Sequence, residues 1–260
     1  PGANANAVKE LVIAALLVSS RKLTEAAQWT KTLKGQPDMD KLVEGGKKKF
    51  AGPEITGKTL GVIGLGAIGV LVANSALSLG MEVVGYDPFL SVKSAWHISG
   101  QVKLAGSIEE VVAQSDYVTI HVPQNDKTKN MVNKELLNVF KKGSRLINLA
   151  RGGLVDPAAV AEALDNGTLS KYVTDFAADE LLDKENVITF PHLGASTPES
   201  EENCAVMAAL ELKEYIKYGN IKNSVNFPNC EAPFTGKARV TIAHQNIPNM
   251  VGSITAIFAK

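Results

Sequence analysis

Short apolar runs alternate with amphipathic runs through the middle of the chain. The apolar runs are rich in β-branched residues, as buried strands are, whereas the runs between them repeat apolar residues at helical spacing. Strands that alternate with helices predict an α/β fold with a doubly wound, Rossmann-like parallel sheet and right-handed crossovers. We expect its strands at residues 60–63, 82–86, 102–104, 117–120, 145–148, 172–174 and 187–189.

Helices are expected between these strands and on both sides of them. Asn6, Ser107 and Asn133 stand where N-caps are needed, and Pro157 fits a first helical turn. Residues 226–236 are rich in Pro, Asn and Gly, which is typical of a linker, and a new strand is expected at 238–243. The expected helices cover 7–23, 68–79, 91–98, 107–113, 134–140, 157–164, 197–218 and 253–259.

The first strand–helix–strand unit carries the glycine-rich turn Gly64-Leu65-Gly66-Ala67-Ile68-Gly69 and ends at Asp87. Gly64 allows a sharp turn off the strand, Gly66 lets a pyrophosphate approach the backbone, and Gly69 lets the helix pack closely. The helix N-terminus offers free N–H groups to phosphates. A carboxylate at Asp87 accepts hydrogen bonds from both ribose hydroxyls and repels a 2′-phosphate, so the pattern predicts an NAD site.

A second nucleotide-binding motif matches the sequence but not the expected secondary structure around it. The segment from Gly52 to Thr59 matches GxxxxGKT, which would make the chain a P-loop NTPase. A P-loop follows a strand and opens a helix, whereas an apolar strand is expected directly after Thr59. The context therefore argues against this alternative.

Composition narrows the class of protein. The chain has 260 residues with 45% hydrophobic positions, and Lys+Arg and Asp+Glu are both 27, which gives no sign of a nucleic-acid or membrane partner. The apolar stretch Leu11–Val18 is too short for a bilayer span, and no signal peptide is evident. Cys204 and Cys230 form neither a disulfide framework nor a metal cluster, so a cytoplasmic protein with no metal site is expected.

The segment from Thr24 to Phe50 is mixed and polar. Trp29 stands alone among charges there, which leaves open a partner surface or a side chain that folds back on its own domain. Lys47-Lys48-Lys49 favours a solvated face over a nucleic-acid patch. The chain opens at Pro1 without Met and closes at Lys260 within an expected helix, so we expect it to be a piece of a longer protein.

Polar side chains follow three of the later strands. Arg151 comes after 145–148, the acidic run from Asp175 to Glu180 after 172–174, and His192 after 187–189. Arg can bind a carboxylate through two parallel bonds, and His exchanges protons near neutral pH when a carboxylate orients it. Hydride transfer from a hydroxy acid requires such groups. Spacing alone also allows a surface ion-pair Arg, a solvated acid and a packed loop His.

The chain resembles the D-isomer-specific 2-hydroxyacid dehydrogenases over nearly its whole length. Four segments carry the resemblance: GLGAIG, LARGGLVD, the acid five residues after Asp175, and PHLGAST. The resemblance implies that Arg151 binds the substrate carboxylate and carbonyl, that His192 is the acid–base group and that Glu180 supports it. Glu180-Leu181 departs from the family's usual Glu-Pro. The implied NAD contacts are Gly64, Gly66, Ala67, Ile68, Gly69, Asp87, His121, Val122, Pro123, Thr128, Ala150, Asp175 and Gly194.

The resemblance also implies a domain organisation. Residues 1–193 would form the NAD-binding domain, 194–235 the return segment of an incomplete substrate domain with its linker, and 236–260 part of an ACT-like regulatory domain. ACT domains bind amino acids, and His244 and Asn246 match residues that bind serine in some relatives. The implied effector is L-serine, and the alternative is a plain strand–turn–helix without a ligand.

The implied activity is NAD-dependent oxidation of a small 2-hydroxy acid by hydride transfer, in a homo-oligomer that is a dimer or a tetramer. The resemblance implies that the first part of the substrate domain, with its phosphate-binding residues, precedes the cofactor domain and is not in this chain. An NAD-sensing interaction protein of the same fold is the alternative, because relatives of this fold serve as corepressors. The ACT-like tail favours amino-acid metabolism.

Overall fold

A computed structural model describes residues 2–245 and 247–259. The chain divides into two compact units, Pro1–Asn203 and Cys204–Lys260. The first unit holds every strand of the sheet and most of the helices. Each unit is described by itself below.

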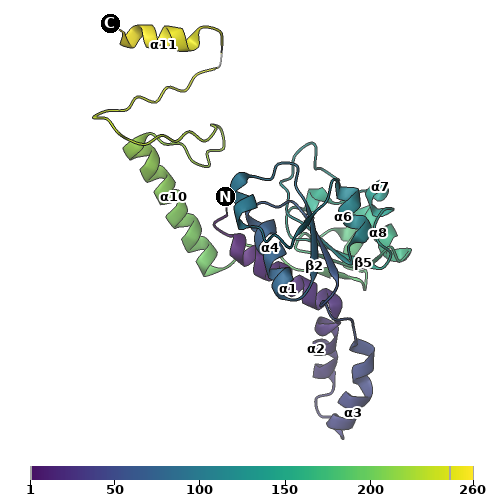
Figure 1. The fold of residues 1–260 in the computed structure, drawn as a ribbon. Helices are drawn as coiled ribbons and strands as arrows, with labels where there is room; N and C mark the ends of the chain where they lie inside the picture. The colour runs from purple at the N-terminus through teal and green to yellow at the C-terminus, as the bar shows by residue number, and fades with distance from the viewer. Residues whose placement is uncertain (1, 246, 260) are drawn as a thin grey trace. The chain divides into compact units, whose positions relative to one another are not determined.

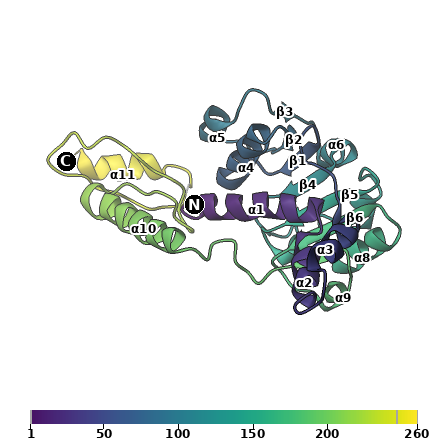
Figure 2. The same ribbon diagram turned by 90° about the horizontal axis from the view of Figure 1, so that it is seen from below.

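The first unit is built on one sheet of seven strands in the order β3-β2-β1-β4-β5-β6-β7. All neighbouring strands pair in parallel, as the alternation of strands and helices predicts. Figure 2 shows these strands side by side, with α1 running along one face. The strands are β1 Thr59–Ile63, β2 Glu82–Tyr86, β3 Lys103–Leu104, β4 Tyr117–Ile120, β5 Ser144–Asn148, β6 Leu169–Thr174 and β7 Val187–Thr189.

Helices cover both faces of the sheet and bury one apolar cluster on each. One cluster joins α1 and α4 to residues such as Leu60 and Val62, and the other joins α6, α7 and α8 to residues such as Ile63 and Ile120 (Figure 1). Alternate residues of β1 thus face opposite layers, as strand geometry requires. The helices of this unit are α1 Ala5–Ser20, α2 Leu23–Thr32, α3 Met39–Gly46, α4 Ala67–Ser78, α5 Val92–His97, α6 Ile108–Gln114, α7 Lys134–Leu137, α8 Pro157–Asp165 and α9 Asp179–Leu182, with 3-10 turns η1 Lys47–Phe50 and η2 Gly152–Leu154.

The strand order reverses direction at β1. The chain first runs outward through β2 and β3 and then returns to place β4 on the other side of β1. The carboxyl ends of β1 and β4 therefore diverge into loops on opposite sides of the sheet. A crevice at such a reversal is where open α/β sheets bind ligands.

Several helix boundaries differ from the expected ones for local reasons. The first helix ends at Ser20 because the hydroxyls of Ser19 and Ser20 both donate to the Leu16 carbonyl, at 2.9 and 2.7 Å. The helix after Asn133 is short, although Asn133 caps it as predicted by accepting the Leu136 N–H at 3.0 Å. Thr59 begins β1 and no helix follows it, which rules out the P-loop geometry.

Residues 23–50, expected to be mixed and polar, form the hairpin of α2, α3 and η1, which extends away from the sheet (Figure 1). Trp29 folds back on this hairpin. Its ring lies 5.2 Å from that of Phe50 between centroids, and the Lys49 Nζ lies 4.2 Å from the Trp29 ring centre. Lys47 pairs with Glu44.

The second unit contains most of α10 Pro198–Tyr218 and all of α11 Met250–Phe258. The two expected helices are thus confirmed. The strand expected at 238–243 is wrong, because these residues form neither a strand nor a helix. An isolated strand leaves its backbone groups unpaired, and the described pairing in this unit is a single bridge between Ile221 and Cys230.

Candidate functional site

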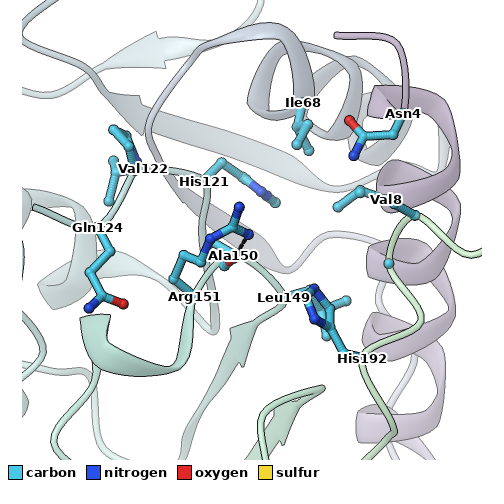
Figure 3. A pocket seen from close by; sticks show the side chains of 13 residues that line it. Asn4, Val8, Ile68, His121, Val122, Gln124, Leu149, Ala150, Arg151 and His192 are labelled. Carbon is cyan, nitrogen blue, oxygen red and sulfur yellow. Dashed lines mark hydrogen bonds between the residues drawn. The ribbon is translucent and has the colours of Figure 1, made fainter. Parts of the chain in front are cut away.

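A cavity of about 430 Å³ opens at the carboxyl ends of the central strands (Figure 3). It lies where the reversal of strand order predicts a ligand site. Segments that are far apart in sequence supply its walls: the start of α1, the start of α4, and the loops that follow β4, β5 and β7. The lining residues are Asn4, Val8, Ile68, His121, Val122, Pro123, Gln124, Leu149, Ala150, Arg151, His192, Gly194 and Ala195.

The glycine-rich turn joins β1 to α4. Gly64 has φ +93° and lies so close to the next strand that a Cβ would meet the His121 carbonyl at 2.6 Å. A Cβ on Gly69 would lie 1.9 Å from the Gly64 carbonyl, so Gly69 closes the turn tightly. A Cβ on Gly66 would meet nothing within 4 Å. Gly66 therefore leaves open space at the helix N-terminus, where a phosphate can approach the backbone.

Asp87 follows β2 and is held by two backbone groups. Its Oδ2 accepts the N–H of Leu65 at 2.8 Å, and its Oδ1 accepts the N–H of Phe89 at 2.8 Å. The first bond ties the carboxylate to the glycine-rich turn. A carboxylate oxygen has two lone pairs, so both oxygens retain capacity for the hydroxyls of a ribose.

Arg151 lies on the loop after β5, and the buried Asn148 holds that loop from within. The Asn148 Nδ2 donates to the Arg151 carbonyl at 2.9 Å, and the Asn148 Oδ1 accepts the Ala150 N–H at 3.2 Å. The Arg151 side chain is exposed in the cavity, where its Nη1 donates to the Ala150 carbonyl at 2.6 Å (Figure 3). The rest of the guanidinium fork remains available for an anion.

His192 follows β7 and is exposed in the same cavity. Its ring packs against Phe176, with 4.9 Å between ring centroids. Glu180 lies in the first turn of α9 and is exposed. Within the part of the chain that the structure describes, no ion pair joins Glu180 to His192, so the structure does not bring the expected pair together.

Asp175 lies directly after β6 and is 3% exposed. Both of its carboxylate oxygens are buried, and neither has a hydrogen-bond partner among the described residues. Burial raises the pKa of Asp175. The nearby His192, the backbone N–H groups of Gly194 and of Asp175 itself, which approach outside regular hydrogen-bond geometry, and Arg151 lower this pKa by smaller amounts. Gly194 approaches closely, since a Cβ there would lie 3.4 Å from the Asp175 Oδ2. A buried acceptor without a partner marks a place for a ligand donor.

The loop after β4 carries His121, Val122 and Pro123 into the cavity. The His121 Nε2 lies 3.0 Å from the Thr119 Oγ1, while its Nδ1 is buried without a partner among the described residues. Burial lowers the pKa of His121 to about 4, so this imidazole is neutral at physiological pH. Thr128 does not line the cavity, and its hydroxyl braces the loop by donating to the Pro123 carbonyl at 2.7 Å.

The structure thus gathers eight of the expected residues around one cavity: Ile68, His121, Val122, Pro123, Ala150, Arg151, His192 and Gly194. The other expected residues of the first unit do not line it: Gly64, Gly66, Ala67, Gly69, Asp87, Thr128, Asp175 and Glu180. His244 lies in the second unit, and Asn246 lies outside the described residues. The expectations missed other lining residues. Asn4 and Val8 reach the cavity because α1 packs on α4, which no local motif signals, whereas Gln124 directly follows Pro123. The missed lining residues are Asn4, Val8, Gln124, Leu149 and Ala195.

Among the described residues, no group of three His, Cys, Asp or Glu side chains is placed to hold a metal ion. None of the described helices combines the length and the apolar character needed to cross a bilayer.

Residues 13–194 match the model of the D-isomer specific 2-hydroxyacid dehydrogenase, NAD binding domain. D-3-phosphoglycerate dehydrogenase of Methanocaldococcus jannaschii is 34% identical over 98% of this chain and 47% of its own length. The Bacillus subtilis enzyme of the same name is 39% identical over 71% of this chain and 36% of its length. The chain therefore spans about half the length, or less, of the curated relatives it matches.

Solved structures agree with these matches. D-mandelate dehydrogenase of Rhodotorula graminis has a TM-score of 0.72 at 26% identity, over 83% of this chain and 63% of that one. D-lactate dehydrogenase of Aquifex aeolicus, complexed with NAD and lactic acid, has a TM-score of 0.68 at 28% identity, over 84% of this chain and 68% of that one.

Proposed function

The chain belongs to the D-isomer specific 2-hydroxyacid dehydrogenase family, and we propose that the protein as a whole oxidises 3-phosphoglycerate to 3-phosphohydroxypyruvate with NAD. That reaction is the first step of serine synthesis. The choice of substrate rests on the relatives, because several of them are named D-3-phosphoglycerate dehydrogenase.

One observation supports the chemistry most directly. Arg151 and His192 line the same cavity, next to the start of the helix that follows the glycine-rich turn. An anion-binding fork and a proton-exchanging ring are the two groups that a hydroxy acid needs, one for its carboxylate and one for its hydroxyl. Their convergence from loops after two different strands favours a dehydrogenase over a protein that only senses NAD.

The residues present fit NAD. Gly66 leaves room for a pyrophosphate at the start of α4, and Asp87 is positioned to accept ribose hydroxyls. A carboxylate oxygen of Asp175 can accept an N–H of a carboxamide, which would give a buried acceptor a partner. When bound, NAD accepts the hydride from the carbon that carries the substrate hydroxyl.

The chain's own side chains supply the remaining steps. Arg151 binds the substrate carboxylate and holds the hydroxyl toward His192. A nitrogen of the neutral His192 imidazole takes the hydroxyl proton as the carbonyl forms, and the ring returns that proton in the reverse reaction. His121 is neutral and half-buried, so it acts as a hydrogen-bonding wall of the cavity rather than as an acid.

Glu180 remains the acid that we propose to orient His192. In the structure it stands on the exposed first turn of α9, so this role requires residues 176–180 to move toward the cavity when substrate binds. An acid next to the imidazole would favour its protonated form and so help it retain the proton that it takes.

We also propose that residues 1–193 form the NAD-binding domain, that 194–235 return to the substrate domain and that 236–260 begin an ACT-like domain with L-serine as effector. The helix α11 supports the last assignment, and His244 and Asn246 are the residues proposed to hold serine. Serine titration of the full-length protein, by calorimetry and by rate, tests it: the absence of binding at millimolar serine would exclude this effector.

The substrate is tested by an NAD-linked assay of the full-length protein against 3-phosphoglycerate, glycerate and lactate. We expect the highest kcat/KM with 3-phosphoglycerate. Faster turnover of lactate or glycerate would retain the family and overturn this substrate. NAD binding without turnover of any of the three would favour the NAD-sensing alternative.

A further inference from the structure

We propose that Asn148 is the positioning residue of Arg151, which it controls by clamping the backbone of the loop that carries it. The inference rests on the proposed role of Arg151 as the group that binds the substrate carboxylate. It extends that role to a side chain that lines no part of the cavity.

Asn148 stands at the last position of β5 and is fully buried, with 0% exposure. It is paired in register with Ile120 on one side and Thr174 on the other, so its backbone is fixed within the sheet. A polar amide is costly to bury at such a place unless its hydrogen bonds are satisfied.

Both ends of the Asn148 amide bond the same short loop, and the side chain also lies next to the Tyr172 hydroxyl of β6. The Nδ2 donates to the Arg151 carbonyl at 2.9 Å, and the Oδ1 accepts the Ala150 N–H at 3.2 Å. A side chain that bonds the backbone two and three residues on closes a compact turn. The clamp therefore determines where the chain leaves the sheet on its way into the cavity.

The clamp also determines where the guanidinium lies. Arg151 has an extended backbone, with φ −154° and ψ 138°, and its Nη1 donates to the Ala150 carbonyl at 2.6 Å. Asn148 holds the N–H of Ala150, and Arg151 rests on the carbonyl of the same residue. Asn148 thus holds the two peptide groups that flank the one on which the guanidinium rests, and lines no part of the cavity itself.

The consequence is specific to carboxylate binding. A bidentate contact depends on the direction of the fork, and a displacement of about 1 Å in a reacting group can reduce the rate by roughly 100-fold. Of the implied NAD contacts only Ala150 lies on this loop, whereas those on the glycine-rich turn and at Asp87 lie outside it. Loss of the clamp should therefore weaken binding of the carboxylate far more than binding of the cofactor.

The test is a double-mutant cycle in the full-length protein, with Asn148→Ala, Arg151→Gln and the double variant. Two quantities are measured: kcat/KM for 3-phosphoglycerate, and the affinity of the NAD complex for oxalate as a carboxylate probe. We expect Asn148→Ala to lower both by roughly 10- to 100-fold, with less than a twofold change in NAD affinity. In the Arg151→Gln background the same substitution should have almost no further effect.

Two variants separate positioning from general stability. The Asn133 side chain caps α7 by accepting the Leu136 N–H at 3.0 Å. Asn133→Ala removes this cap and should lower the melting temperature without changing the affinity for oxalate. Asn148→Ser replaces the two polar atoms of the amide with a single hydroxyl on a shorter side chain, so it should have an intermediate effect. It replaces Asn148→Ala in the cycle if that variant fails to fold.

The inference would be overturned if the fold-losses of kcat/KM and oxalate affinity in Asn148→Ala and Arg151→Gln multiplied in the double variant. It would also be overturned if Asn148→Ala weakened NAD as much as it weakened oxalate. If the wild-type protein binds oxalate but turns over none of the hydroxy acids, the oxalate cycle still decides the role of Asn148, and the proposed function alone fails. If the wild-type protein neither binds oxalate nor turns over a hydroxy acid, both proposals are overturned.

Discussion

The carboxylate of Asp87 accepts the backbone N–H of Leu65 at 2.8 Å, across the gap between two neighbouring strands. This bond joins the end of β2 to the glycine-rich turn after β1. The two parts of the NAD motif are therefore one connected unit, in which the group proposed to bind the ribose also supports the turn proposed to bind the pyrophosphate.

Asp87→Ala should consequently weaken NAD by roughly 10- to 100-fold, the effect of losing hydrogen bonds to a charged group. Binding of NADP should weaken less, because the carboxylate no longer repels a 2′-phosphate. Both dissociation constants can be measured by calorimetry. Glu82→Ala, at the exposed start of the same strand, is the control and should change neither. An unaltered ratio of NAD to NADP affinity in Asp87→Ala would contradict the assignment.

The glycines of the turn should separate folding from cofactor binding. A Cβ on Gly69 would lie 1.9 Å from the Gly64 carbonyl, so Gly69→Ala should lower the free energy of unfolding by about 1–3 kcal/mol. A Cβ on Gly66 meets nothing within 4 Å, so Gly66→Ala should leave the melting temperature nearly unchanged and weaken NAD. Denaturant unfolding and NAD titration of both variants check this. Gly66→Ala with full NAD affinity would show that the pyrophosphate lies elsewhere.

His121 should make stability depend on pH. Burial lowers its pKa to about 4, so the folded protein holds the neutral ring that the unfolded chain protonates below its ordinary value of 6.5. The stabilisation is present above pH 6.5 and is lost as the pH falls toward 4, up to about 3 kcal/mol in all. Denaturant unfolding at several pH values should show a shallower loss in His121→Gln. The control His97→Gln, at an exposed helical position, should follow the wild-type curve.

Asp175 should show the opposite dependence. Its pKa is raised by burial, so its contribution to stability is present at low pH and is lost as the pH rises through the folded-state value. Asp175→Asn should therefore raise the melting temperature of the NAD-free protein at pH 7.5 by about 2–4 °C, the shift that roughly 1 kcal/mol produces in a domain of this size.

The gain should shrink on acidification, and NAD binding should weaken because an acceptor for the carboxamide is lost. Differential scanning calorimetry with and without NAD measures both effects. The exposed Asp126→Asn should change neither the melting temperature nor the affinity. Destabilisation of the NAD-free protein by Asp175→Asn at pH 7.5 would argue against an unpaired carboxylate at this site.

The strands were predictable from sequence wherever the apolar run is unbroken, as in β4. The strand β6 begins at Leu169. The sequence predicts a later start, at residue 172, because Lys171 interrupts the apolar run. Lys171 is nevertheless buried, at 6% exposure, and its Nζ lies 3.0 Å from the Glu25 Oε1. Such a pairing between residues 146 positions apart leaves no trace in local periodicity.

The site divides in the same way. Arg151 and His192 are candidates from sequence because ligand-binding loops follow the carboxyl ends of parallel strands, but their roles come from the family resemblance. Asn4 could not be predicted, because it reaches the cavity through the packing of α1 on α4. Residues 238–243 have an apolar sequence that predicts a strand, but they form none in the structure. A strand also needs a partner strand, which local sequence does not reveal.

The central claim is that Arg151 and His192 act together on a 2-hydroxy acid. Its most direct test is NAD reduction by the full-length protein with 3-phosphoglycerate, compared among wild type, Arg151→Lys and His192→Gln. We expect His192→Gln to lower kcat by roughly 100- to 10,000-fold, the range for loss of a general acid–base group. Arg151→Lys should lower kcat/KM by roughly 10-fold or more with NAD affinity intact, because Lys cannot reproduce the bidentate fork. Near-normal turnover by His192→Gln, or an equal loss of NAD and substrate affinity in Arg151→Lys, would contradict the account.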